Sequence, residues 1–257
     1  MVQRYTIAAA EGVEGELLAA ALWNAGTLGV WEHGDRLVAW FPEATSTVPA
    51  GGQWEPEPDR DWLAEWKAGF EPVRIGRLTL TPSWHTTERP GEFTIVLDPG
   101  MAFGTGHHAT TRLCLIALEG TELSGRRVLD IGTGSGVLAL AAKRLGAAEV
   151  VAVDVDPDAV AVAASNAARN QLSVDLRVGS LEAVAHDAPF DVVVANLSSD
   201  LVLKLAADIL AVTIPGGLVI VSGLLMEKMG IVSRGFGAQL LTVDREDEWA
   251  ALTLSTP

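Results

Sequence analysis

The pattern of apolar and polar positions divides the chain into two differently organised parts. From residue 109 to the C-terminus, short β-rich apolar runs such as VLDIG and FDVVVAN alternate with longer segments whose apolar positions recur at helical spacing. This alternation predicts a parallel, doubly wound α/β sheet that binds its ligand at the carboxyl ends of the strands. The last two predicted strands, 238–246 and 248–255, are separated by a short turn, which predicts an antiparallel hairpin at the edge of the sheet.

The first part of the chain predicts a small α+β domain of ferredoxin-like layout. We expect a strand at 2–9, a helix at 13–26, and two strands at 28–33 and 36–41 that are joined at a turn-prone Gly-Asp pair. Seven of the eight tryptophans lie in the first 84 residues, whereas the remainder is rich in Ala, Val and Gly. The two parts are therefore different structural units.

The segment between the two parts is predicted to connect them. Residues 42–59 are rich in Pro, Gly, Ser and Thr, which indicates a loop or linker rather than a helix or strand. Residues 60–70 then predict a short helix, and residues 74–84 predict strands. We assign the chain to an N-terminal domain (1–58), a linker helix and strands (59–95) and a larger domain (96–257).

Composition narrows the class of protein. The 257 residues are 49% apolar, yet no apolar stretch approaches the ~20 residues that span a bilayer, and no charged-then-apolar leader opens the chain. The single cysteine, Cys114, forms no internal disulfide and has no C-x-x-C partner for zinc. We therefore expect a monomeric cytoplasmic protein that contacts no membrane. The formal charge of −15 disfavours nucleic acid and favours a basic partner, although acidity is also a common solubility feature.

A glycine-rich turn, LDIGTGSG at 129–136, follows the first predicted strand of the large sheet. It fits neither the dinucleotide fingerprint, because Val137 stands where the third glycine is needed, nor the P-loop, because no lysine follows. Asp130 precedes Gly132 and Gly134, and a carboxylate there repels pyrophosphate but suits a ligand with sulfonium and ammonium charges. A second acid, Asp154, ends the next predicted strand, where a carboxylate accepts hydrogen bonds from a ribose diol. The pattern indicates adenosine without phosphate, as in S-adenosylmethionine.

With these motifs, residues 125–222 resemble the class I methyltransferase domain, a Rossmann-like doubly wound sheet. After the fourth predicted strand of that domain the sequence is ANLSS, at the place where amino-directed methyltransferases of this class carry Asn-Pro-Pro-aromatic. Only Asn196 is retained. Its side-chain carbonyl is suited to accept a hydrogen bond from an amine and to aim the lone pair at the methyl carbon, so we assign it the catalytic role. The departure after Asn196 leaves open what packs against the incoming amine.

The loop PGMAFGTGHHATT, just before the glycine-rich turn, makes the resemblance more specific. Together with LDIGTGSG, ANLSS and the small N-terminal domain, it closely resembles the bacterial methyltransferases of ribosomal protein L11, the PrmA family, over about residues 60–250. The resemblance implies S-adenosylmethionine as cofactor, and as acceptors the lysine ε-amines and the N-terminal amine of this large-subunit ribosomal protein. It also implies that the N-terminal domain holds the substrate, with no direct nucleic acid contact. The implied cofactor-binding residues are Phe103, Gly104, Thr105, Thr111, Asp130, Gly132, Gly134, Asp154 and Asn196.

Three alternatives remain at this point. The adjacent histidines His107 and His108 have no metal-ligand spacing, so we expect no metal, but His108 fits either a general base or a structural residue of the loop. The chain also fits a non-catalytic regulatory module that binds S-adenosylmethionine. Finally, it fits a methyltransferase of another protein or of a small amine, although the tryptophan-rich first domain argues for a macromolecular substrate.

Overall fold

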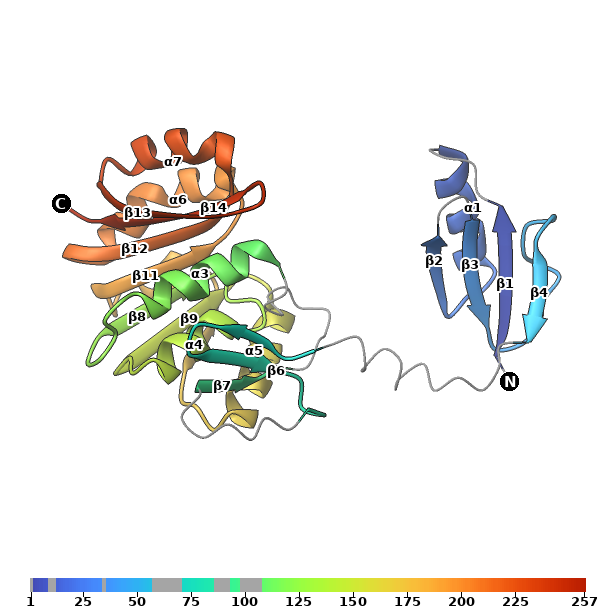
Figure 1. The fold of residues 1–257 in the computed structure, drawn as a ribbon, viewed down its shortest axis with the longest axis horizontal. Coiled ribbons are helices and arrows are strands. Elements are labelled where there is room, and N and C mark those ends of the chain that lie inside the picture. The colour runs from blue at the N-terminus through green and yellow to red at the C-terminus, as the bar shows by residue number, and fades with distance from the viewer. Residues whose placement is uncertain (1, 9–12, 34–35, 57–70, 86–92, 98–107) are drawn as a thin grey trace. The chain divides into compact units, whose positions relative to one another are not determined.

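The structure is a computed structural model that describes residues 2–8, 13–33, 36–56, 71–85, 93–97 and 108–257. The chain divides into two compact units, Met1–Gly69 and Phe70–Pro257 (Figure 1). Each unit has its own hydrophobic core and is described by itself. Among the described residues, no helix is long and apolar enough to cross a membrane.

The first unit is a four-stranded antiparallel sheet with one described helix. Its elements are β1 (Gln3–Ala8), α1 (Val13–Asn24), β2 (Gly29–His33), β3 (Arg36–Phe41) and β4 (Gln53–Pro56). The strand order is β2-β3-β1-β4, and every pair is antiparallel. Alternate residues of β1 and β3 point to a core that also contains Leu22 of α1. The predicted strand, helix and two following strands are confirmed.

Strand β4 corrects the prediction that residues 42–59 form only a loop or linker. It pairs with β1, and Trp54 packs on Tyr5 with 4.8 Å between the ring centroids. The Tyr5 hydroxyl accepts a hydrogen bond from the Gly52 amide at 2.9 Å and donates one to the Pro49 carbonyl. The Pro- and Gly-rich composition hid this strand because an edge strand tolerates proline where an inner strand does not.

The second unit contains a seven-stranded sheet in the order β10-β9-β8-β11-β12-β14-β13. The first five strands of this order are parallel, and β14 is antiparallel to both of its neighbours. The predicted doubly wound sheet and its terminal hairpin are therefore confirmed. The strands are β8 (Arg127–Ile131), β9 (Glu149–Asp154), β10 (Asp175–Val178), β11 (Phe190–Asn196), β12 (Thr213–Leu225), β13 (Gln239–Glu246) and β14 (Trp249–Ser255).

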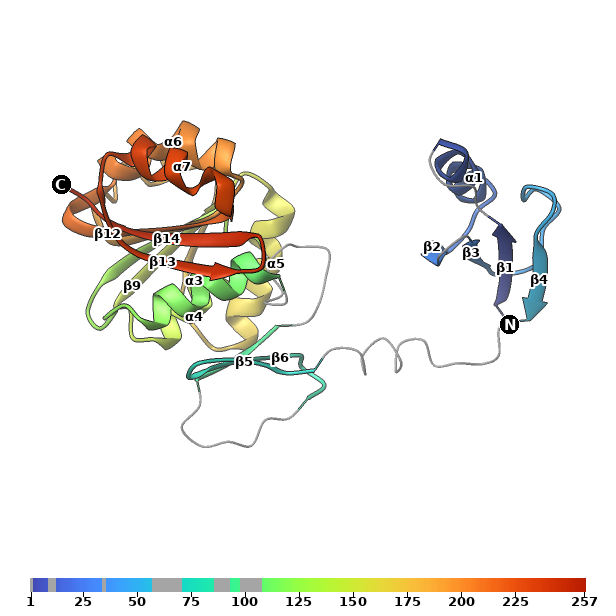
Figure 2. The same cartoon turned by 45° about the horizontal axis from the view of Figure 1, so that its top comes forward.

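Helices cover both faces of this sheet, as Figure 2 shows. On one face lie α3 (Ala109–Glu119), α4 (Val137–Arg144) and α5 (Pro157–Arg169), whose buried residues share a core with one set of alternate residues of β8, β9 and β11. On the other face lie α6 (Ser199–Ala211) and α7 (Met229–Phe236), which share a second core with the alternate residues of the same strands. The unit also contains two short 3-10 helices, Leu181–Val184 and Met226–Lys228.

A separate three-stranded sheet packs on the face that carries α3. It consists of β5 (Val73–Ile75), β6 (Leu78–Thr81) and β7 (Phe93–Val96). The Asn170 side chain, at the end of α5, accepts from the Val96 amide at 2.7 Å and donates to its carbonyl at 2.8 Å. These strands, which the sequence assigned to a connecting segment at 59–95, share the core of the second unit. The helix predicted at 60–70 lies outside the described residues.

Candidate active site

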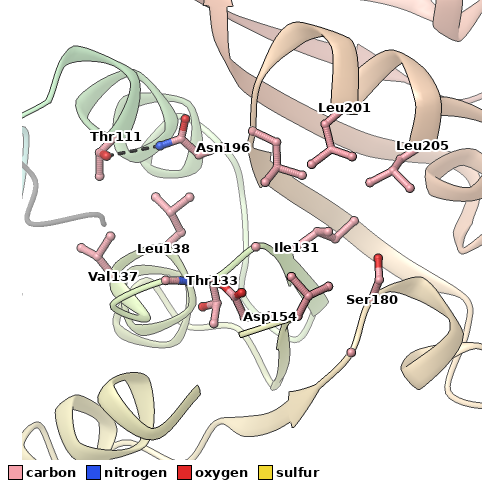
Figure 3. A pocket seen from close by; sticks show the side chains of 15 residues that line it. Thr111, Ile131, Thr133, Val137, Leu138, Asp154, Ser180, Asn196, Leu201 and Leu205 are labelled. Atoms are coloured by element: carbon pink, nitrogen blue, oxygen red, sulfur yellow. Dashed lines mark hydrogen bonds between the residues drawn. The ribbon is translucent and has the colours of Figure 1, made fainter. Parts of the chain in front are cut away.

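A cavity of about 320 Å³ opens at the carboxyl ends of β8, β9, β10 and β11 (Figure 3). This is the edge at which a doubly wound sheet binds its ligand. Five residues singled out from the sequence line it, namely Thr111, Gly132, Gly134, Asp154 and Asn196. The remaining lining residues are Ile131, Thr133, Val137, Leu138, Val155, Gly179, Ser180, Leu197, Leu201 and Leu205.

The glycine-rich turn forms the floor of the cavity between β8 and α4. Gly132, Gly134 and Gly136 have φ values of 70°, 54° and 83°, in the left-handed region that favours glycine. A Cβ on Gly132 would lie 2.5 Å from the Leu197 side chain, and one on Gly136 would lie 3.0 Å from Ala163 of α5. The alternate glycines therefore serve close packing of the turn on two neighbouring segments, and they leave the backbone exposed to the cavity.

The carboxylate of Asp154 is held rigidly at the cavity wall. One oxygen accepts from the Gly134 amide at 2.9 Å, and the other accepts from the Asp156 amide at 3.0 Å. Each carboxylate oxygen has a further lone pair, so the group keeps the capacity to accept hydrogen bonds from a diol. The following side chain, Val155, is 74% exposed and lines the same cavity. The cavity wall therefore presents the carboxylate oxygens of Asp154 next to the apolar side chain of Val155.

Asp130 occupies a different position from the one that its sequence neighbours suggest. It is fully buried, and it is absent from the cavity lining. One oxygen accepts from the Thr133 hydroxyl at 2.6 Å and from the Ala139 amide at 3.2 Å, while the other has no hydrogen-bond partner among the described residues. Burial raises the pKa of this carboxyl to about 7. In the structure Asp130 holds the glycine-rich turn from behind, through Thr133.

Asn196 and Thr111 meet at one end of the cavity, although 85 residues separate them. The Asn196 amide group, at the end of β11, donates to the Thr111 hydroxyl at 3.2 Å, as the dashed line in Figure 3 shows. Thr111 is fully buried in the first turn of α3. Because the amide nitrogen is held by Thr111, the amide oxygen of Asn196 is left to accept a hydrogen bond from a ligand.

The opposite end of the cavity was not anticipated from the sequence. Leu201 and Leu205 project from α6, and Gly179 and Ser180 follow β10 (Figure 3). The available signals were the position of Ser180 directly after a predicted strand and the four-residue spacing of the two leucines, which places them on one helix face. This apolar end suits a flat ring, whereas the Thr111 and Asn196 end suits a polar group.

His108 begins α3 and caps it. Its Nδ1 accepts from the Thr110 amide at 3.4 Å and lies 2.8 Å from the Thr110 hydroxyl, and its ring meets the Trp249 ring edge-to-face at 5.2 Å. These contacts give His108 a structural role at the helix terminus. Phe103, Gly104, Thr105 and His107 lie outside the described residues. In the described part of the chain, no group of three His, Cys, Asp or Glu side chains is arranged to hold a metal ion.

Comparison with known proteins gives consistent matches. The family model of the Ribosomal protein L11 methyltransferase (PrmA) matches residues 41–257. A Ribosomal protein L11 methyltransferase of Deinococcus radiodurans is 42% identical over 249 residues, covering 90% of this chain and 91% of the relative. One of Thermus thermophilus is 41% identical over 234 residues, with the same coverage of 90% and 91%. The crystal structure of a ribosomal protein L11 methylase from Lactobacillus delbrueckii subsp. bulgaricus matches with a TM-score of 0.68 and 31% identity, over 73% of this chain and 99% of that one.

Proposed function

Because the chain belongs to the ribosomal protein L11 methyltransferase (PrmA) family, we propose that it methylates ribosomal protein L11 at lysine ε-amines and at the N-terminal amine. The observation that carries this proposal is the Asn196 amide, which Thr111 holds at the cavity end beside the glycine-rich turn. A hydrogen-bond acceptor fixed at that point selects a ligand group that donates a hydrogen bond, such as an amine. A module that only binds the cofactor has no need of it.

The residues of the cavity fit S-adenosylmethionine, the cofactor of this class of enzyme. Gly132 and Gly134 bring backbone without side chains to the cavity wall, and Asp154 has lone pairs for the two ribose hydroxyls. Val155 and Leu201 offer apolar surface for the adenine ring. The negative charge of Asp154 at the cavity wall favours a ligand with sulfonium and ammonium charges over one with phosphate.

When bound, S-adenosylmethionine supplies an electrophilic methyl group, which the amine nitrogen takes while the electrons of the broken C–S bond stay on sulfur. The chain contributes alignment. Asn196 accepts a hydrogen bond from the amine and thereby orients its lone pair, and Thr111 prevents the amide from turning away. A lysine of ordinary pKa about 10.4 must first lose a proton, and burial beside positive charge lowers that pKa. Because the Nδ1 of His108 caps α3, we assign the proton to water rather than to this histidine.

We assign recognition of the substrate protein to the N-terminal domain at 1–58. Residues 1–60 contain three arginines, no lysine and nine acidic residues, a net charge of −6 that suits a basic ribosomal protein. An enzyme that methylates several amines on one substrate protein must bind that protein in more than one orientation. A separate recognition domain on a linker permits this. We also propose that the protein is a monomer and acts in the cytoplasm, where ribosomal proteins are made.

The decisive experiment combines cofactor titration with mass spectrometry of ribosomal proteins after incubation with the enzyme. We expect S-adenosylmethionine to bind and ribosomal protein L11 to gain mass in steps of one methyl group. Binding without methylation of any protein would support the regulatory module, and methylation of a different protein or a small amine would reassign the substrate.

A truncated chain that starts at Phe70 tests the role of the first domain. It should bind the cofactor normally but fail to methylate intact ribosomal protein L11. High salt should likewise weaken substrate docking by the complete chain, because it screens the acidic surface. Full activity of the truncated chain on the intact protein would move recognition onto the second unit.

A further inference from the structure

Two asparagines lie on the buried face of α5, where the other buried side chains are alanines. Asn166 is 3% exposed, and Asn170, which caps the C-terminus of the helix, is 5% exposed. A buried side-chain amide is costly unless its donors and its acceptor are hydrogen-bonded. The partners of these two amides therefore identify the segments that they hold.

Asn166 holds the glycine-rich turn through a backbone carbonyl. Its Nδ2 donates to the Ser135 carbonyl at 2.9 Å, and its Oδ1 accepts from Arg169 at 3.1 Å. If α4 began one turn earlier, the Ser135 carbonyl would accept from the Ala139 amide, but that amide donates to Asp130 at 3.2 Å. Two side chains, one from β8 and one from α5, thus bond the backbone groups that a helix would pair with each other.

Ser135 stands between two glycines that connect the turn to the cavity and to α5. On one side, the Gly134 amide donates to the Asp154 carboxylate at 2.9 Å. On the other side, Gly136 packs closely against Ala163 of α5, since an added Cβ would lie 3.0 Å from the Ala163 Cβ. A displacement of Ser135 away from α5 would therefore also displace Gly134, the residue whose amide orients the carboxylate.

Asn170, one helical turn after Asn166, fastens α5 to its neighbours. Its side chain bonds both backbone groups of Val96, at 2.7 and 2.8 Å, at the end of β7. Its Nδ2 also donates to the Asn166 carbonyl at 2.8 Å, and its own carbonyl accepts from Arg144 of α4 at 3.2 Å. Asn166 therefore projects from a helix that is fixed to the small sheet and to the helix after the turn.

We propose that Asn166 is a positioning residue of the cofactor site. Through Ser135 it holds the glycine-rich turn where the Gly134 amide orients the Asp154 carboxylate toward the ribose hydroxyls. This inference rests on the proposed function and adds to it a residue that does not line the cavity. The effect of Asn166 on S-adenosylmethionine binding passes through Asp154.

The test compares Asn166→Leu, which removes the hydrogen bond and keeps a side chain of similar shape, with Thr213→Val as the matched control. The buried Thr213 hydroxyl donates to the Ile209 carbonyl at 2.7 Å. It lies at the amino end of β12, the edge of the sheet opposite to the cavity. Both changes thus remove one buried hydrogen bond to a backbone carbonyl. For each protein we would measure the free energy of unfolding, the affinity for S-adenosylmethionine, and the KM and kcat.

We expect both variants to lose free energy of unfolding, whereas only Asn166→Leu should bind S-adenosylmethionine more weakly, by about three- to tenfold. The KM for the cofactor should rise by a similar factor, with kcat at saturating cofactor within about twofold of the unaltered protein. The inference is overturned if Asn166→Leu binds the cofactor normally, or if Thr213→Val loses as much affinity.

A double-mutant cycle tests the route through Asp154. When Asp154 is already alanine, Asn166→Leu should weaken cofactor binding by less than about twofold, because the carboxylate that the turn orients is gone. Fully additive losses would overturn the inference, since Asn166 would then act without Asp154.

Nuclear magnetic resonance keeps the inference testable if Asn166→Leu does not fold. In the unaltered protein, the side-chain amide signals of Asn166 should shift when S-adenosylmethionine binds, although this residue does not line the cavity, and the Thr213 backbone amide signal should not. Unmoved Asn166 signals refute the coupling. If the unaltered protein does not bind S-adenosylmethionine at all, the proposed function fails instead, so the two failures are distinguishable.

Discussion

Replacing Asp154 with alanine is expected to weaken S-adenosylmethionine binding about ten- to a hundredfold while the protein stays folded. The carboxylate accepts hydrogen bonds from two backbone amides, at 2.9 and 3.0 Å, and these bonds fix its orientation without a ligand. Hydrogen bonds to a charged acceptor contribute about 1.5 to 3 kcal/mol each. Two such bonds to the ribose hydroxyls, partly replaced by water in the variant, correspond to the stated loss of about 1.4 to 2.8 kcal/mol.

Calorimetric titration with S-adenosylmethionine measures the effect directly. Asp154→Asn keeps one accepting oxygen and should lose less affinity than Asp154→Ala. Asp158→Ala removes the same charge in the first turn of α5 without touching the cavity lining, and it should bind normally. If Asp154→Ala is folded, as judged by an unchanged thermal unfolding transition, and binds with the affinity of the unaltered protein, the ribose assignment is refuted.

Three further changes test other parts of the site. Asn196→Ala should lower kcat far more than cofactor affinity, because the amide aligns the amine near the transition state; steady-state kinetics with calorimetry would contradict this if binding alone suffered. Gly223→Ala should reduce kcat at least tenfold, because the new Cβ collides with the Leu197 carbonyl directly after Asn196, whereas Gly216→Ala, also at positive φ but with open space around it, reports the backbone strain alone. The free energy of unfolding of the unaltered protein should fall as the pH rises from about 4 to 7, because the folded chain keeps a proton on Asp130 that the unfolded chain releases, and Asp130→Asn should abolish this fall. Denaturant titrations at pH 5 and pH 8 should show a loss on the order of a few kcal/mol in the unaltered protein and little change in the variant. The same change in both proteins would exclude the raised pKa.

Much of the fold, and the place of several candidate residues at the cavity, was predictable because local signals agree with the global structure. The alternation of short apolar strands and amphipathic helices is the direct consequence of a parallel sheet that is buried on both faces. Asp154 was identifiable because the end of a strand is visible in the sequence, and the carboxyl ends of parallel strands share one edge. Thr111 and Asn196 were identifiable only through the resemblance, since nothing local indicates that residues 85 positions apart exchange a hydrogen bond.

The features that escaped sequence reasoning depend on tertiary contacts. Strand β4 exists because Trp54 packs on Tyr5 at the edge of the first sheet, and its Pro- and Gly-rich surroundings carry no strand signal. The sequence does not distinguish an acid that lines the cavity from one behind its wall, because Asp130 and Asp154 both lie beside the same turn. Trp249 gains its position from the pairing of β14 inside the sheet, which the predicted hairpin alone does not fix.

Two glycines fix the position of Leu197, and with it the position of the preceding residue, Asn196. Gly132, in the turn after β8, makes room for the Leu197 side chain, and Gly223, in β12, makes room for the Leu197 backbone. The Leu197 amide also donates to the Ser222 carbonyl at 3.1 Å, so the residue after Asn196 is held between two neighbouring strands. Either glycine replaced by a larger residue pushes this segment, and with it the amide that aligns the amine. With the role proposed for Asn196, the glycine-rich turn is expected to serve the substrate side of the reaction as well as the cofactor side, because it positions the Leu197 side chain.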